Sequence, residues 1–271
     1  MKKHLISALL FLLLAGSLRS DEFPCLGLTA KSVFVYDITT DRIIYAKAPD
    51  AKLPGASTIK LMTALVTLDH YGTMRSARPT KRAFDFPYKK YLKPGVDYST
   101  DDLLRALLLA SSNDSANCLA EAIAGNRDNF VNLMHERASE LGAADTLFAN
   151  PSGLPHEKVP QFTTAKDLCR MMREFLRYPR LYGMIKESDN VIRGADGKEV
   201  FLQNHNRLLK RYPNVCVGKT GYTRAAKHCF VGYSLVPRKR YIFVILGADR
   251  PWQDMSRLLY YAGCISQIVE K

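Results

Sequence analysis

The chain has 271 residues, of which 47% are hydrophobic, with 13 prolines and 16 glycines. This composition excludes a low-complexity or disordered chain and predicts one globular domain large enough to bury a core. The formal net charge is +13. The basic residues are scattered along the sequence, which is more typical of solvated faces than of a nucleic-acid interface.

The N-terminus has the pattern of a secretory signal. Two lysines precede a nearly continuous apolar stretch at residues 5–14, and small residues follow at 15–17. The stretch is shorter than the roughly 20 residues of a membrane span, so we expect a signal peptide at 1–20 and a catalytic domain at 21–271. An uncleaved anchor is the alternative. For an exported protein, the expected partners of this positive charge are anionic envelope polymers or lipid headgroups, the latter through peripheral membrane contact, and not nucleic acid.

After the N-terminal segment, the first two thirds of the chain begin with a strand pattern and continue with helical patterns. Residues 31–49 alternate around β-branched and aromatic side chains with a polar turn at 39–42, which predicts a hairpin. Residues 57–70 have helical spacing and are apolar nearly all round, which is typical of a helix at a domain centre. Helical patterns continue at 101–141, with a break at Ser-Ser-Asn, and at 163–176.

Strand patterns return near the C-terminus. An Asp-Gly turn within residues 191–202 predicts one hairpin, and residues 228–249 predict another that turns at 237–240. Residues 252–269 predict a closing amphipathic helix. Strands at both ends with helices between them indicate an α+β fold, in which an antiparallel sheet is flanked by helices and an all-α subdomain is inserted.

The spacing of the cysteines and histidines bears on disulfides and metal sites. The six cysteines are Cys25, Cys118, Cys169, Cys216, Cys229 and Cys264. An oxidising compartment permits disulfides, but six cysteines allow 15 pairings and the sequence does not choose among them. Cys118, Cys169 and Cys264 occur in apolar helical patterns, which favour buried free thiols. No C-x-x-C or H-E-x-x-H pattern occurs, so we expect no metal and no cofactor.

Ser57 and Lys60 are three residues apart at the start of a predicted helix. This spacing puts both on one face, with Cβ atoms about 5 to 6 Å apart. A serine hydroxyl becomes a nucleophile when a base removes its proton, and lysine can be that base if burial or a nearby cation lowers its pKa. Backbone N–H groups at the helix start can stabilise an oxyanion. The alternative is a capping serine and a solvated lysine.

A second candidate pair, Ser111 and Asn113, occurs at the break between two predicted helices. A competing S-x-N pattern is formed by Ser115 and Asn117. We prefer the first pair because side chains at a helix break can point into a cleft, whereas Ser115 begins a helix and is explained as a turn or cap residue. Capping is also the alternative role for Ser111.

A third candidate motif is Lys219-Thr220-Gly221, before the C-terminal strands. On an edge strand it offers a cation, a hydroxyl and a position without a side chain where substrate backbone can approach; a plain β-turn is the alternative. Together, S-x-x-K, S-x-N and K-T-G in this order are far more specific than any one of them. They are the signature set of penicillin-interacting serine enzymes.

With these motifs the sequence resembles the low-molecular-mass penicillin-binding proteins, the serine D-alanyl-D-alanine carboxypeptidase family. The blocks "NPSGLP", "FTTAKDL" and "NHNRLL" extend the resemblance over roughly residues 30–250. It implies acyl transfer on peptidoglycan stem peptides, with release of terminal D-alanine. It also implies that β-lactam antibiotics acylate the same serine, and that no metal or cofactor takes part.

The resemblance implies a role for each residue of the first two motifs. Ser57 is the acylated nucleophile, and Lys60 is the base that activates it. Ser111 relays protons toward the leaving group, and Asn113 donates a hydrogen bond to the peptide carbonyl of the substrate.

The resemblance also assigns roles to the C-terminal strands. Lys219 supplies positive potential and keeps the pKa of the catalytic lysine low, while Thr220 binds the terminal carboxylate beside Gly221. The backbone N–H groups of the nucleophile and of Tyr222 form the oxyanion hole. Arg250 assists carboxylate recognition, with an exposed loop arginine as the alternative.

The sequence departs from the family pattern in two places. Cys216, Val217 and Gly218 stand where Asp-Gly and an apolar residue often precede K-T-G. Many relatives also have a second β-rich domain and an amphipathic anchor, and we expect neither here. The short architecture also occurs among D,D-endopeptidases that cut peptidoglycan cross-links, which is the first alternative function.

Two further functions compete with the carboxypeptidase. A class A β-lactamase needs an acidic residue that activates the deacylating water, and Glu157 in "SGLPHEKVPQ" lacks the expected setting. A catalytically silent penicillin-binding sensor would retain the fold. The complete set of motif residues argues against the sensor, because binding does not require both a nucleophile and its base.

Overall fold

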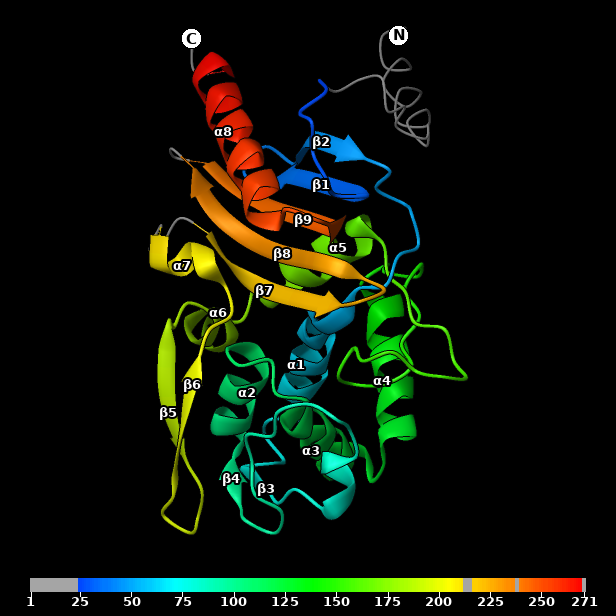
Figure 1. Ribbon diagram of the computed structural model, residues 1–271, viewed down its shortest axis with the longest axis vertical. Helices are drawn as coiled ribbons and strands as arrows, with labels where there is room; N and C mark the ends of the chain where they lie inside the picture. The colour runs from blue at the N-terminus through cyan, green and yellow to red at the C-terminus, as the bar shows by residue number, and fades with distance from the viewer. Residues whose placement is uncertain (1–23, 212–215, 237–238, 270–271) are drawn as a thin grey trace, which may run out of the picture.

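The computed structural model describes residues 24–211, 216–236 and 239–269 (Figure 1). The predicted signal peptide at residues 1–20 lies outside the described residues, and so do residues 237–238 of the predicted turn. Within the described ranges, no helix combines the length and the apolar character needed to cross a membrane.

A five-stranded antiparallel sheet forms the upper half of the molecule in Figure 1. Its order is β2-β1-β9-β8-β7, and the strands are β1 (Ser32–Asp37), β2 (Arg42–Lys47), β7 (Cys216–Thr223), β8 (Lys227–Val236) and β9 (Lys239–Ala248). The predicted hairpins β1–β2 and β8–β9 are confirmed by their antiparallel registers. The K-T-G motif lies on β7, which is an edge strand, as expected.

The two faces of the sheet pack against different helices because side chains alternate along each strand. On β9, Phe243 and Ile245 pack toward α8 (Pro251–Val269), whereas Ile242 and Val244 belong to the core shared with the helical region. Figure 1 shows α8 lying across one face and α5 (Ala165–Phe175) behind the other. The buried carboxylate of Asp254 fixes α8 to the N-terminal segment.

The remaining elements are mostly helical and lie below the sheet in Figure 1. They are η2 (Ala56–Ile59), α1 (Lys60–Asp69), β3 (Ser76–Ala77), η3 (Lys81–Phe84), β4 (Tyr98–Ser99), α2 (Thr100–Leu108), α3 (Asn113–Ala124), α4 (Arg127–Glu140), α6 (Pro179–Ile185), β5 (Asp189–Arg193), β6 (Glu199–Gln203) and α7 (Arg207–Arg211). Helix α1 is buried from Lys60 to Thr67, so the expected central helix is confirmed. The α+β fold class is confirmed as well, with two small ribbons, β3–β4 and β5–β6, beside the helices.

The helical stretch predicted at 101–141 consists of three helices. Ser112 ends the first break, because its side chain accepts a hydrogen bond from the Ser115 N–H and caps α3. The second break was not predicted: Gly125 adopts a φ of 77°, and Asn126 then caps α4.

The cysteines of the described part are free thiols: Cys25, Cys118, Cys169, Cys216 and Cys229. The first is exposed and the other four are buried. Burial raises the pKa of Cys118, Cys169 and Cys216 to about 12, and that of Cys229 to about 11. The expected buried thiols at 118 and 169 are confirmed, while the side chain at Cys264 lies outside the description.

Candidate active site

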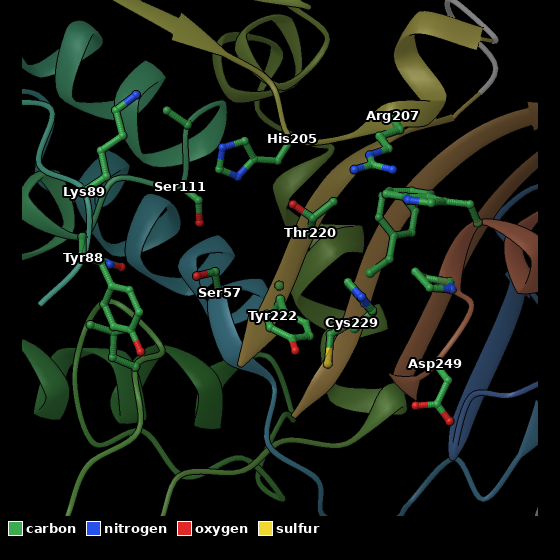
Figure 2. A pocket seen from close by; sticks show the side chains of 18 of the residues that line it. Ser57, Tyr88, Lys89, Ser111, His205, Arg207, Thr220, Tyr222, Cys229 and Asp249 are labelled. Carbon is green, nitrogen blue, oxygen red and sulfur yellow. The ribbon is translucent and has the colours of Figure 1, made fainter. Parts of the chain in front are cut away.

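The three motifs meet at one cavity of about 890 Å³ between β7 and the helical region (Figure 2). The motif residues that line it are Ser57, Ser111, Asn113, Thr220, Gly221 and Tyr222. The two motif lysines, Lys60 and Lys219, are buried behind this lining, with relative exposures of 0% and 1%, and are bonded to Ser57 and Ser111. The structure thus brings together side chains that are more than 50 and more than 100 residues apart in the chain.

Ser57 lies in a short 3-10 turn, η2, rather than in the first turn of the α-helix that the sequence predicted. The preceding residue, Ala56, has a φ of 46°, which is uncommon for a residue other than glycine. Gly153 packs directly against this turn, since a Cβ there would lie 2.1 Å from the Ala56 carbonyl oxygen. The strained turn separates Ser57 from α1, which begins at Lys60.

The Nζ atom of Lys60 has three partners. It lies 2.9 Å from Ser57 Oγ, 2.8 Å from Asn113 Oδ1 and 2.5 Å from the Ser152 carbonyl oxygen. As an ammonium it donates to all three. As a neutral amine it has two N–H groups for the two oxygens that can only accept, and its lone pair then faces the Ser57 hydroxyl. This is the geometry of a base beside its nucleophile.

The charge state of Lys60 follows from its surroundings. Burial lowers its pKa well below the usual value, and the positive charge of Lys219 lowers it further, while Asp114 acts in the opposite direction. Lys219 is also fully buried, and burial lowers its pKa to about 7. The burial of Lys60 and the positive charge of Lys219 both favour the neutral amine of Lys60.

Ser111 connects the second motif to the third. Its hydroxyl accepts a hydrogen bond from Lys219 Nζ over 2.9 Å, and its φ of 56° turns it out of the helix break. The competing pair points elsewhere: Ser115 Oγ donates to the buried Leu103 carbonyl, and Asn117 Nδ2 donates to the Ala83 carbonyl.

Strand β7 approaches the nucleophile turn closely at Gly221. A Cβ on Gly221 would lie 3.0 Å from the Ser57 backbone nitrogen and 3.1 Å from that of Thr58. The next residue, Tyr222, is 60% exposed, and its ring lies tilted against that of His228 with ring centroids 4.6 Å apart. Gly221 therefore allows the backbones of the nucleophile turn and β7 to lie side by side.

Arg250 lines the same cavity, but within the described residues no hydrogen bond or ion pair joins it to a motif residue. Its backbone N–H donates to Thr29 Oγ1, and its side chain has no ion pair among the described residues. Glu157, which a β-lactamase would require, is exposed and does not line the cavity. In the described part of the chain, no cluster of three or more histidine, cysteine or acidic residues could hold a metal ion.

Several residues of the cavity were not predicted. The carbonyl of Ser152 contacts the lysine through its backbone, so its residue type gives no signal, although "NPSGLP" marked the segment. Asp114 is buried and accepts from the Tyr91 and Leu92 backbone N–H groups over 2.6 and 2.8 Å. It thereby fixes the loop that carries Lys89 at the cavity wall.

Other unpredicted residues come from the segment after β6 and from α8. His205 and Arg207 line the cavity, as does Trp252, whose ring contacts Phe230 edge-on at 6.1 Å. Neither His205 nor Arg207 was singled out from the sequence, because neither belongs to the three motifs.

Comparison with known proteins identifies the family. Residues 20–250 match the profile of Peptidase S11, the D-alanyl-D-alanine carboxypeptidases. The chain belongs to this family. Its members are serine peptidases, and the chain is a hydrolase of this class.

Relatives with assigned names differ in their activities. The chain is 32% identical to D-alanyl-D-alanine carboxypeptidase DacF of Bacillus subtilis over 82% of its length, but it spans only 58% of DacF. It is 32% identical to DacB2 of Mycobacterium tuberculosis, covering 86% of this chain and 78% of DacB2. It is 31% identical to the D-alanyl-D-alanine endopeptidase of Escherichia coli, covering 84% and 75% respectively.

A solved structure shares the fold over nearly the whole described chain. The D-alanyl-D-alanine carboxypeptidase from Mycobacterium tuberculosis H37Rv superposes with a TM-score of 0.80 at 30% identity, covering 92% of this chain and 94% of that one.

Proposed function

We propose that the protein is a serine D-alanyl-D-alanine carboxypeptidase that acts on peptidoglycan stem peptides through an acyl-enzyme. The observation that carries this proposal is the position of Lys60 Nζ, 2.9 Å from Ser57 Oγ and bonded to two oxygens that only accept. A buried neutral amine in this position can take the hydroxyl proton.

Acylation starts when Ser57 Oγ attacks the carbonyl carbon of the penultimate D-alanine and Lys60 takes the proton. The oxyanion lies between the backbone N–H groups of Ser57 and Tyr222, which the close approach at Gly221 brings near each other. Donors that are already in place stabilise the developing charge without reorganisation.

The leaving group occupies the part of the cavity near the other two motifs. The terminal carboxylate binds Thr220 in the positive potential of Lys219, with Arg250 assisting from the cavity wall. The Ser111 hydroxyl, bonded to Lys219 Nζ, relays a proton to the departing amine. Asn113 donates a hydrogen bond to the peptide carbonyl of the substrate.

Water then hydrolyses the ester and releases the shortened stem peptide. A β-lactam uses the same residues, because its ring amide resembles the scissile bond and opens onto Ser57. Its leaving amine stays covalently attached, so the acyl-enzyme persists.

The test measures D-alanine release from a muramyl pentapeptide and the mass gained with benzylpenicillin. Ser57→Ala should abolish both, and Lys60→Ala should reduce turnover by more than about 10²-fold, the lower range for loss of a general base. Thermal unfolding of each variant controls for folding. Near-full activity of Lys60→Ala would refute the base assignment.

The same assays separate the competing functions. Penicillin acylation without D-alanine release would indicate a sensor, and rapid hydrolysis of the penicillin would indicate a β-lactamase. Lys219→Ala should mainly weaken substrates that carry the terminal carboxylate, which is measured as a loss in kcat/KM relative to a substrate amide.

We also propose that residues 1–20 are a signal peptide and that residues 21–271 are the catalytic domain of an exported, cell-envelope protein with peripheral membrane contact. The charged, apolar and small-residue order at the N-terminus supports export, and the excess of positive charge supports contact with anionic headgroups. N-terminal sequencing of the protein from envelope and membrane fractions tests both points.

A further inference from the structure

A second cavity, of about 820 Å³, lies in the helical region and is nearly as large as the one at Ser57. Its walls are the segment around η3, the turn from α3 into α4, and part of the loop at 149–156. No residue of the three motifs lines it. The proposed acyl transfer therefore leaves this cavity without a role.

The two cavities share two chain segments. The segment at 78–91 lines the second cavity with its first half and the Ser57 cavity with its second half. In the loop at 149–156, Asn150 lines the second cavity and Leu154 lines the Ser57 cavity. A ligand that lies along these segments reaches from one cavity to the other.

The acyl part of the stem peptide extends along one of these shared segments. The proposed position of the terminal carboxylate is at Thr220, and Figure 2 shows Tyr88 on the opposite side of Ser57. The stem residues upstream of the scissile bond therefore leave Ser57 along the wall that carries Tyr88. This wall belongs to the segment at 78–91, which continues into the second cavity.

The length of a stem peptide suits the separation of the two sites. Lys60 Nζ lies 2.9 Å from Ser57 Oγ and 2.5 Å from the Ser152 carbonyl oxygen. The Ser152 N–H in turn donates to Asn150 Oδ1 over 3.1 Å. These contacts place the Asn150 wall on the order of 10 Å from the nucleophile, and four extended residues span roughly 13 Å. The sugar that carries the stem can thus reach the second cavity while the scissile carbonyl is at Ser57.

The lining of the second cavity is polar and carries both charges in balance. Arg78 pairs with Asp97. The other charged residues of the lining form no ion pair in the part of the chain that the structure describes, and they are three cations and three acids: Lys81, Arg82, Arg127, Asp85, Glu121 and Asp128. Because the signs balance, a polyanion is repelled as well as attracted, and an apolar ligand would desolvate charged groups. Sugar hydroxyls both donate and accept, so they can bond side chains of either sign.

His156 adds a donor of fixed orientation to this lining. Its Nδ1 accepts from the backbone N–H groups of Lys158 and Val159 over 3.2 and 3.0 Å. The neutral ring therefore carries its proton on Nε2. Because the side chain is exposed, this N–H can donate to a hydroxyl or to the acetamido oxygen of an amino sugar.

We infer that the second cavity binds the glycan strand of peptidoglycan, next to the sugar from which the stem at Ser57 is suspended. This inference rests on the proposed function, since it takes a stem peptide at Ser57 as its starting point. The enzyme then prefers stems that are still attached to the polymer over free peptides. Glycan contacts far from the reacting atoms bind the ground state and the transition state alike, so they act mainly on KM.

The first experiment compares two substrates of the full chain by D-alanine release. One is an uncross-linked glycan oligosaccharide that carries pentapeptide stems, and the other is the same pentapeptide with an acetylated N-terminus and no sugar. The wild type should show a kcat/KM at least about tenfold higher for the glycan-bound stem. Asp85→Ala/Arg127→Ala should lower this advantage about tenfold, mainly through KM, as expected for the loss of two hydrogen-bonded contacts. The free pentapeptide should be cut at the wild-type rate.

The double variant removes one acid and one cation, so the net charge of the chain is unchanged. Arg193→Ala/Glu199→Ala is the matched control, because it removes an exposed ion pair on the β5–β6 ribbon that lines neither cavity. It should retain the full advantage of the glycan-bound stem, and an equal loss in the control would overturn the site. Stoichiometric acylation by benzylpenicillin shows that each variant is folded.

The second experiment examines the second cavity while Ser57 is blocked. The benzylpenicillin-acylated protein is titrated in a calorimeter with a peptide-free glycan oligosaccharide whose lactyl groups are capped as amides, which leaves the ligand uncharged. The wild type should bind it at least about tenfold more tightly than Asp85→Ala/Arg127→Ala. About 0.5 M salt should change the wild-type affinity less than about twofold, because screening acts on charged partners.

The outcomes distinguish this inference from the function on which it rests. Absence of glycan binding to the acylated protein, or equal turnover of the two substrates, would overturn the glycan site and leave the carboxypeptidase standing. Binding that collapses in salt would indicate a site for an anionic polymer and would overturn it as well. Failure to cleave either substrate would refute the proposed function itself.

Discussion

Gly221→Ala tests whether the close approach of β7 to the nucleophile turn determines the rate of acylation. The added Cβ would lie 3.0 Å from the Ser57 nitrogen and the Gly55 carbonyl oxygen, whereas ordinary contact begins at 3.4 Å. These neighbours are backbone atoms that no rotamer change can move. The strand must therefore retreat by about 0.3 to 0.4 Å, which widens the gap between the two proposed oxyanion donors.

The expected loss can be scaled from the effect of misplacement on catalysis. A shift of about 1 Å can cost roughly 10²-fold, so on a logarithmic scale a shift of about 0.3 to 0.4 Å costs about four- to sixfold. This corresponds to about 1 kcal/mol in the barrier. The observable is the second-order rate constant for acylation by a fluorescent penicillin.

Gly72→Ala provides the matched control, because a Cβ at Gly72 meets no atom within 4 Å and should leave the rate unchanged. Acylation of Gly221→Ala at the wild-type rate, with the protein fully folded, would show that the spacing between β7 and the turn does not limit the reaction.

Three further outcomes follow from the described contacts. In the proposed mechanism acylation needs neutral Lys60, so the rate should fall as pH drops through its lowered pKa; Lys219→Ala removes a cation that lowers this pKa, so stopped-flow profiles should show the acid limb moving to higher pH. Asp254→Asn weakens the acceptor of two backbone N–H groups of the N-terminal segment and should cost about 1 to 3 kcal/mol, or several degrees in Tm, with kcat retained. Iodoacetamide at pH 8 should modify Cys25 well before the four buried cysteines, as followed by peptide mapping.

The sequence predicted the strands, the central helix and the three motifs because each has a local signal. Hydrophobic spacing identified α1, and its burial from Lys60 onward agrees with an apolar pattern that covers the whole circumference. The order of the motifs, together with the family resemblance, led us to expect that distant residues would converge. The structure does bring Ser57, Lys60 and Ser111 to one cavity.

What the sequence missed depends on long-range packing. The 3-10 turn at Ser57 is shaped by Gly153, nearly 100 residues later, and the Ser152 carbonyl bonds Lys60 without any side chain. The break between α3 and α4 was missed because Gly125, whose positive φ ends α3, lies within a continuous helical pattern. His205 was overlooked because its position at the cavity depends on long-range bonds of the neighbouring residues, such as that from Asn206 Nδ2 to the Cys216 carbonyl on β7, which no residue spacing reveals.

The position of β1 has a consequence for how the protein is made. This strand pairs with β9, the last strand in the chain. Close to it, the Ala30 N–H donates to the carboxylate of Asp254, 224 residues further along the chain. The entropy of closing so long a loop must be met before the sheet is complete. A growing chain therefore lacks the middle strand of the sheet until its final segment is made, so the complete sheet that carries the K-T-G motif can form only at the end of synthesis.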